Sequence, residues 1–264
     1  MIKRGFTLIE ILITFTIIGI AAAITLPALF KSSQNEANAA RLKASVRNFE
    51  TAMATMIAAE GVNNLYETTA WRVGEVNASA DNSVKAGFLN SIERFITTVG
   101  YQEGENPVTA YYGGKSVYAL DNSGKKGSAI DDINGCLPLI MKDGSVIFIR
   151  TFSKTTNSPN DNGYMGLQRV AFTHGTSLNG NPADIFIDVN GAKEPNTVGR
   201  DLFHFYVNSD GTLFPFGSLD VVVYHNGNET DANYWEVGCT NNNKANNGWP
   251  CTARLIEEGY KMNY

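Results

Sequence analysis

The sequence predicts an α+β protein in which one long N-terminal helix packs on an antiparallel β-sheet. Three observations predict it: residues 6–30 carry a single charge, residues 31–60 place apolar side chains at helical spacing, and strand-like runs follow from Cys136. At 264 residues the chain is long enough to bury a substantial core. Charged residues make up 18% and the formal net charge is -5, so the chain lacks the basic surface that nucleic-acid binding needs.

The N-terminal apolar segment is long enough to cross a membrane. Its 25 residues, 6–30, contain one charge, Glu10, and one proline, Pro27. At about 1.5 Å per residue a helix of this length spans roughly 30 Å of hydrocarbon. A cleaved secretory signal has an apolar region of about 7 to 15 residues, which is shorter. The only basic residues before the segment lie in the leader, residues 1–5, so the positive-inside rule places the leader in the cytoplasm and the rest across the membrane.

An amphipathic stretch continues the same helix over residues 31–60. Gly61 is a natural C-terminal stop, so span and amphipathic stretch together predict one helix from about Phe6 to Glu60, roughly 80 Å long. Pro27 is expected to kink it, because proline removes a backbone donor and clashes with the preceding turn. The apolar positions that form one face of the second half are Leu42, Val46, Phe49, Met53, Met56 and Ile57.

The first residues carry a specific resemblance. The stretch GFTLIE, behind a short basic leader, resembles the class III signal of type IV prepilins and type II secretion pseudopilins. The resemblance implies that a membrane prepilin peptidase cuts after Gly5 and methylates the new N-terminal residue, Phe6. Counted from Phe6, Glu10 is the fifth residue and Pro27 the twenty-second, the positions where the family carries a glutamate and many members a proline. The close resemblance covers about the first 60 residues.

A carboxylate in this position needs a physical reason. An intramembrane carboxylate costs a few kcal/mol on insertion scales, and a plain signal anchor, the alternative interpretation, would gain nothing from it. Cleavage creates a cationic amine at Phe6, which Glu10 could neutralise in the same subunit or in a neighbour. The resemblance implies the neighbour, with apolar helices bundled into a filament core.

Residues 61–135 are expected to form a variable connecting region, irregular except for one helix. That helix is predicted from the apolar spacing of Phe88, Leu89, Ile92, Phe95 and Ile96, and the run from 121 to 135 is predicted as loop.

Residues 136–264 are expected to form a β-rich domain. The runs CLPLIM and SVIFIR around a Lys-Asp-Gly turn predict a hairpin, ADIFIDVNG predicts a strand, and DLFHFYVNSDGTLFPFG predicts a second hairpin. SLDVVVYH could be a further strand. Alternation places Ile185 and Ile187 on one face against Phe186, and we expect the apolar stripe of the helix to cover one face of this sheet.

The segment from 188 to 203 also looks like pilin-like and pseudopilin-like sheet sequences of the DxNG…PN…G.D.F type. Its residues have a structural interpretation: Asn190-Gly191 supplies a tight turn, and Pro195, Asn196 and Gly199 shape the connection to the next strand.

The three cysteines are interpreted as one disulfide and one buried thiol. Outside the cytoplasm Cys239 and Cys251, with a polar loop between them, are a plausible disulfide, and the resemblance to pilins with a C-terminal disulfide loop supports it. Cys136 is then left over and is better explained as a buried thiol than as a nucleophile, although its exchange with either partner stays open. A zinc site is poorly supported, because the chain has no CxxC.

Other candidate chemistry is weak. Asp184, Asp188 and Asn190, with Glu194 and Asp201 nearby, could offer oxygen ligands to Ca²⁺, but their spacing is not that of an EF-hand and the tryptophan-containing loop usual in calcium-binding major pseudopilins is lacking. Turn formation is favoured, so no metal or cofactor is predicted. The chain has no catalytic motif, and it is not expected to be an enzyme. The histidines, His174, His204 and His225, lie in unrelated settings.

The sequence therefore predicts a structural subunit of a type IV pilus or related filament. The resemblance implies these partners: further copies of the chain, other pilins, prepilin peptidase, and indirectly an assembly platform and an ATPase. It also implies the bacterial inner membrane before assembly and a filament at the cell surface or in the periplasm afterwards. A type II secretion pseudopilin is the first alternative. A membrane-anchored enzyme or adhesin is the second, with Trp235 and Trp249 as the adhesin's aromatic candidates.

Overall fold

The fold is described from a computed structural model, in which the chain forms two compact units, 1–37 and 38–264. The domain boundaries predicted after residues 5, 30, 60 and 135 remain predictions. The residues that the structure describes are 7–104, 106–120, 133–152, 169–172, 182–194, 196–218, 221–225, 228–230, 239 and 248–264.

Helix α1 (Leu8–Glu60) confirms the long N-terminal helix. It continues through Pro27, and Gly61 ends it in a left-handed conformation, with φ of 64°. The Gly61 amide donates to the carbonyl of Ala58 (3.2 Å) and the Val62 amide to that of Ile57 (3.2 Å), so two of the last four carbonyls of the helix are satisfied.

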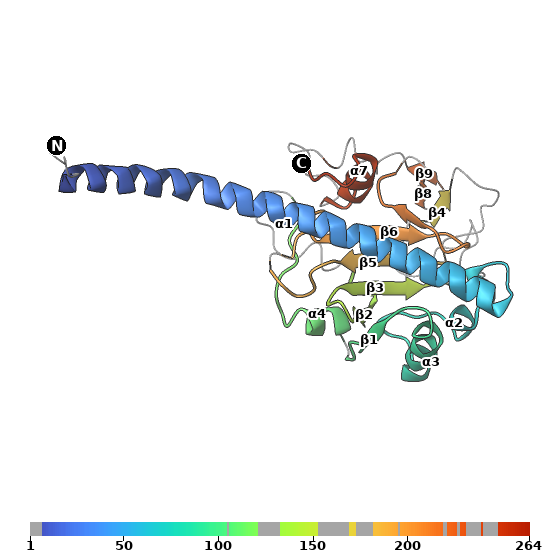
Figure 1. The fold of residues 1–264 in the computed structure, drawn as a ribbon. Coiled ribbons are helices and arrows are strands. Elements are labelled where there is room, and N and C mark those ends of the chain that lie inside the picture. Colours follow the sequence, from blue (N-terminus) through green and yellow to red (C-terminus); the bar gives the residue numbers. More distant parts are fainter. Residues whose placement is uncertain are drawn as a thin grey trace. The chain divides into compact units, whose positions relative to one another are not determined.

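A six-stranded antiparallel sheet forms the centre of the second unit, in the order β1-β2-β3-β5-β6-β7 (Figure 1). Both predicted hairpins, β2-β3 and β6-β7, and the predicted strand β5 are confirmed. The strands are β1 (Thr98–Tyr101), β2 (Leu137–Met141), β3 (Val146–Thr151), β5 (Ala183–Asp188), β6 (Leu202–Val207) and β7 (Leu213–Pro215).

The C-terminal part of α1 covers one face of this sheet, as predicted. Figure 1 shows the helix lying across β3, β5 and β6. Leu42, Phe49 and Met53 of the helix are buried in one cluster with Ile185 and Phe203 of the sheet. The stripe at helical spacing and the strand alternation therefore meet in a single apolar core.

The opposite face of the sheet carries a second core. Phe148, Phe186 and Tyr206 lie there, covered by Tyr112 and Trp249. Phe186 thus lies on the other face from Ile185 and Ile187, which confirms the predicted alternation. A sheet covered on both faces has buried strands throughout, and β3, β5 and β6 are buried along their whole length.

The connecting region is more ordered than predicted. The predicted helix is present as α3 (Asn82–Ile92), but it ends before Phe95 and Ile96, which lie in the turn that follows. The expectation of a single helix in an otherwise irregular region is wrong, because β1 is recruited into the sheet by pairing with β2, which local sequence does not reveal. The further elements are η1 (Leu65–Glu67), α2 (Thr69–Arg72) and α4 (Pro107–Tyr111). Most of the predicted loop 121–135 lies outside the described residues.

Three short strands form a second antiparallel sheet, in the order β4-β8-β9. They are β4 (Arg169–Phe172), β8 (Val221–His225) and β9 (Asn228–Thr230). The strand expected in SLDVVVYH therefore exists as β8, in this separate sheet. Helix α7 (Cys251–Glu257) lies in the part predicted as β-rich, and at seven residues it was too short to reveal itself by periodicity.

Candidate functional site

The candidate site is the start of helix α1, where Thr7 and Glu10 cap each other. The Thr7 amide and hydroxyl both donate to Oε2 of Glu10, at 2.7 Å each, and the Glu10 amide donates to the Thr7 hydroxyl at 3.3 Å. This reciprocal arrangement is a capping box, in which a threonine and a glutamate three residues apart satisfy the free amides of a helix start. One oxygen of the Glu10 carboxylate, Oε2, is therefore satisfied within its own chain.

Sequence reasoning missed the role of Thr7, although the T-x-x-E spacing was a readable signal. Gly5 and Phe6, the predicted processing residues, lie outside the described residues. Cleavage after Gly5 and methylation of Phe6 therefore remain predictions.

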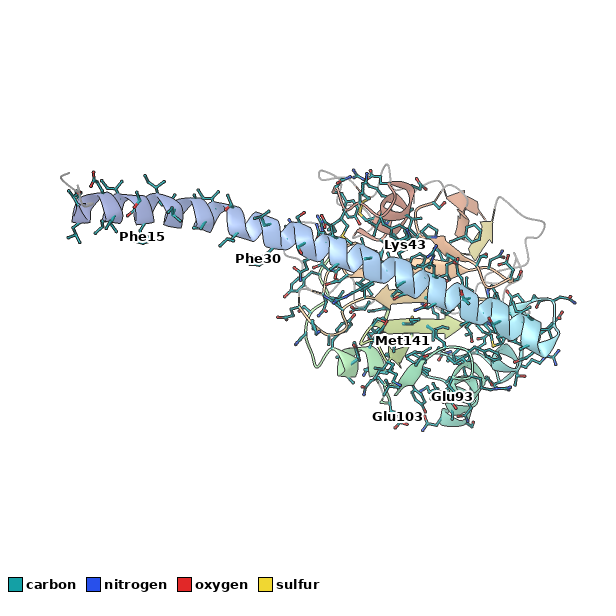
Figure 2. The ribbon with its side chains drawn as sticks, viewed as in Figure 1. Phe15, Phe30, Lys43, Glu93, Glu103 and Met141 are labelled. Carbon is teal, nitrogen blue, oxygen red and sulfur yellow. A yellow bond between two sulfur atoms is a disulfide. The ribbon has the colours of Figure 1, made fainter. Side chains whose placement is uncertain are left out.

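The helix beyond the capping box presents an apolar surface all round. Phe15 and Phe30 are each 70% exposed, and Figure 2 shows both side chains projecting from the helix. Within the described residues, α1 is the helix whose length and composition would allow it to cross a membrane, with a mean hydropathy of 2.3 in its most apolar window. The other large apolar side chains exposed along this segment are Leu8, Ile9, Ile11, Leu12, Ile13, Ile17, Ile18, Ile20, Ile24, Leu26 and Leu29.

The hydroxyl groups of the threonines in this segment donate hydrogen bonds to backbone carbonyls of the same helix. Thr14 donates to the carbonyl of Ile11 (2.8 Å) and Thr16 to that of Leu12 (2.8 Å). Thr25 donates to the carbonyl of Ala21 (2.9 Å). Because each hydroxyl proton is used within the helix, the surface suits lipid or the apolar surface of another helix.

The start of the chain matches a known family motif. Residues 1–26 match the prokaryotic N-terminal methylation motif. This motif is typical of type IV pilins and pseudopilins, which confirms the resemblance seen in GFTLIE. The motif and the apolar helix are consistent with a membrane-anchored prepilin. No curated protein and no solved structure matches the chain.

The segment of the DxNG…PN…G.D.F type connects β5 and β6, and its Pro195 lies outside the described residues. Asn190 donates its amide to Asp188 (3.2 Å) and its side-chain nitrogen to Asp201 (3.3 Å), so it holds both ends of the connection together. Gly191 has a φ of 67°, and a Cβ there would lie 2.8 Å from the hydroxyl of Tyr111 and 2.7 Å from a backbone oxygen of Gly144. Asn196 is fully buried within the same connection. Turn formation, favoured from the sequence, thus accounts for these residues.

The calcium candidates are engaged in hydrogen bonds of the fold. Asp184 forms a buried ion pair with Arg150 (2.8 Å) across β5 and β3. Asp188 instead accepts from the Tyr112 hydroxyl (2.7 Å) as well as from Asn190. Within the described ranges, no group of three or more histidine, cysteine or acidic side chains is gathered as a metal site would require.

The predicted disulfide between Cys239 and Cys251 is present, and both cysteines are buried. Cys136 is a free, buried thiol. Burial raises the pKa of Cys136 to about 12, so at neutral pH it is protonated and a poor nucleophile.

The remaining candidates that the structure describes, His204 and Trp249, are both buried. His204 is stacked between Phe186 and Phe216, at ring distances of 4.1 and 4.9 Å, and burial, with a smaller effect of Arg150, lowers its pKa well below the ordinary value. Trp249 is buried against Phe186 and cannot form an exposed aromatic rim. His174 and Trp235 lie outside the described residues, as does the side chain of His225 in β8.

Proposed function

We propose that the chain is a structural subunit of a type IV pilus or related filament, cleaved after Gly5, methylated at Phe6 and polymerised through its N-terminal helix. The observation that carries this proposal is the exposed, uniformly apolar segment of α1 directly behind a methylation motif. A surface of this kind has to be covered by lipid or by other helices.

The exposed apolar segment has to stay out of water both before and after assembly. Removing a large apolar side chain from water is worth about 1.5–3 kcal/mol, and many such side chains line residues 8–30. In lipid this term is already gained, so the helices gain by packing on each other and by pairing their polar groups. Such a subunit needs no catalytic group of its own.

Glu10 is the residue that favours the filament over the membrane. Before cleavage its carboxylate has Thr7 of the same chain as a partner. Cleavage would add an amine at Phe6, and pairing of that amine with Glu10 of a neighbouring subunit would neutralise the negative charge that the hydrogen bonds from Thr7 leave in lipid. The pairing would also set how far one helix is shifted along the next.

The proposal implies separate partners for each step. Prepilin peptidase would cut the precursor in the bacterial inner membrane, and an assembly platform with its ATPase would add the subunit, together with copies of itself and other pilins, to a filament at the cell surface or in the periplasm. A type II secretion pseudopilin is the alternative, because the methylation motif is common to both classes. A membrane-anchored adhesin is less favoured, since Trp249, one of its two aromatic candidates, is buried; a membrane-anchored enzyme is the other part of this second alternative.

The test is Glu10→Ala in the full chain, with Glu36→Ala as the matched control. Both glutamates are exposed on α1, but Glu36 lies beyond the apolar segment. We expect Glu10→Ala to be cleaved after Gly5 as in the wild type and to yield at least about tenfold fewer filaments, the effect of losing about 1.4 kcal/mol from each subunit addition. Mass spectrometry of the N-terminus and quantification of sheared filaments measure the two steps. Normal filaments from Glu10→Ala would refute the role of Glu10, and an uncleaved wild-type chain would refute the proposal itself.

A further inference from the structure

The connection between β5 and β6 holds two buried carboxyl groups close together. Asp188 is 0% exposed and Asp201 is 1% exposed. Asn190 bonds to both, through its amide to Asp188 and through its side-chain nitrogen to Asp201. Asp188 also accepts from the Tyr112 hydroxyl (2.7 Å), and Asp201 from the Thr197 amide (2.6 Å).

Among the residues that the structure describes, neither carboxyl group has a cationic partner. The titratable groups that face Asp188 are Tyr111 and Tyr112, at the end of α4, and Asp201 itself. The amine of Lys115 donates to the carbonyl of Ala192 (3.1 Å) instead. Across the described part of the chain, no lysine or arginine pairs with either carboxyl group. Two buried negative charges without a cation are expensive, so one of them is expected to be neutralised by a proton.

The bridging residue has room for such a proton. The side-chain oxygen of Asn190 is buried and has no hydrogen-bond donor. A protonated carboxyl group in the same cluster is a donor of the kind that this oxygen lacks.

We propose that Asp188 and Asp201 share one proton near neutral pH, and that this proton makes the connection between β5 and β6 a pH-sensitive latch. The latch is closed while at least one of the two carboxyl groups is protonated, and it loosens when both groups are ionised.

The latch lies where several parts of the second unit are tied together. The Asn38 side chain on α1 donates to the carbonyl of Arg200 (3.2 Å), and the Tyr264 hydroxyl donates to that of Gly199 (2.8 Å). The Val189 amide donates to the carbonyl of Asp201 (2.9 Å). Loosening the connection would therefore weaken the attachment of the helix and of the C-terminal residue to the sheet.

The direction of the pH effect follows from the pKa shifts. Burial raises the pKa of Asp201 to about 7, against hydrogen bonds from Thr197 and Asn190 that lower it. Burial and then the charge of Asp201 raise the pKa of Asp188 well above its usual range. An unfolded aspartate has a pKa of about 3.9. The folded chain therefore holds these protons to higher pH than the unfolded chain does. The contribution of the pair to stability is fully present below about pH 4, and it is lost as the pH rises toward and past 7.

The test compares Asp201→Asn and Asp188→Asn with the wild type, as full chains in detergent, by thermal unfolding at pH 5 and pH 8. Asparagine has the size of aspartate and cannot ionise. We therefore expect the Tm of each variant, measured relative to the wild-type Tm, to be higher at pH 8 than at pH 5 by about 3 °C or more. The control is Asp210→Asn, because Asp210 is an exposed carboxyl group that also accepts hydrogen bonds in a turn. Its difference from the wild type should not change with pH.

Two results would overturn the latch. One is a difference between variants and wild type that is the same at pH 5 and pH 8. The other is that added Ca²⁺ raises the wild-type Tm and removes its pH dependence, and that EDTA reverses both effects. The pair would then bind a cation rather than a proton. If the variants do not fold, the aspartate carboxyl groups of the wild type can be titrated directly by carbon-13 NMR. We expect the pair to show a coupled titration with one step near neutral pH. Ionisation of every aspartate carboxyl group near pH 4 would refute the shared proton.

Discussion

At the scale of single residues, the two hairpins of the main sheet use the same turn chemistry. Asp143 accepts hydrogen bonds from the amide (2.9 Å) and hydroxyl (2.6 Å) of Ser145, and Asp210 accepts the same pair from Thr212 at the same distances. Each turn then has a glycine with positive φ, Gly144 at 87° and Gly211 at 89°. The local sequence signal is therefore the same, but the surroundings differ.

The difference predicts unequal effects of the same substitution. A Cβ at Gly211 would lie 2.6 Å from the Cβ of Met53 on α1, whereas one at Gly144 would meet nothing within 4 Å. We expect Gly144→Ala to cost about 1 kcal/mol from the strained φ alone, and Gly211→Ala to cost about 1–3 kcal/mol more because the turn is pushed off the helix. Chemical denaturation of both variants measures this. Equal losses would mean that the turn is not seated on the helix as described.

At the scale of elements, the sequence predicted what depends on local periodicity. The stripe that includes Leu42 and Phe49, and the alternation around Phe186, are direct consequences of the 3.6 and 2 residue repeats, and both appear in the two cores. Strand β1 was missed because it is held by pairing with β2, and its own four residues include a glycine. The shared burial of Asp188 and Asp201 was equally hidden, because it depends on the return of β6 beside β5.

The disulfide is the element-scale feature with the clearest energetic consequence. Cys239 and Cys251 are 12 residues apart, and closing a loop of this size stabilises the folded state by about 3 kcal/mol in the chain-entropy model. We expect Cys251→Ala to lower the Tm by an amount equivalent to this loss of about 3 kcal/mol. Dithiothreitol should lower the Tm of the wild type toward that of the variant and leave the Tm of the variant unchanged. Cys136→Ala, which removes the free thiol, is the control and should keep the sensitivity to dithiothreitol. If dithiothreitol also lowers the Tm of Cys251→Ala, the disulfide is not the source of the wild-type sensitivity to dithiothreitol.

At the scale of the whole molecule, the chain separates into a part that needs partners and a part that does not. Among the described residues, the large apolar side chains left exposed lie at 8–30, except for Val99. The second unit begins at Asn38 and contains both cores, the disulfide and the whole of the helix stripe. Its folding should therefore be independent of the apolar segment.

This separation predicts the behaviour of two truncated chains, each secreted into an oxidising compartment so that the disulfide forms. Residues 38–264 should be soluble and monomeric without detergent, with a Tm within a few degrees of the full chain, because the buried residues among those described begin at Asn38 and are all retained. Residues 61–264 should fail to fold, because removing Leu42, Phe49 and Met53 uncovers one face of the sheet. Each large side chain lost from a core costs about 2–5 kcal/mol. The loss of several such side chains together exceeds the free energy of unfolding of a typical domain, about 5–15 kcal/mol. Size-exclusion chromatography and thermal unfolding distinguish the outcomes. A chain of residues 38–264 that aggregates would show that the apolar segment is needed for folding as well as for assembly, and a stable 61–264 would show that the stripe is dispensable to the core.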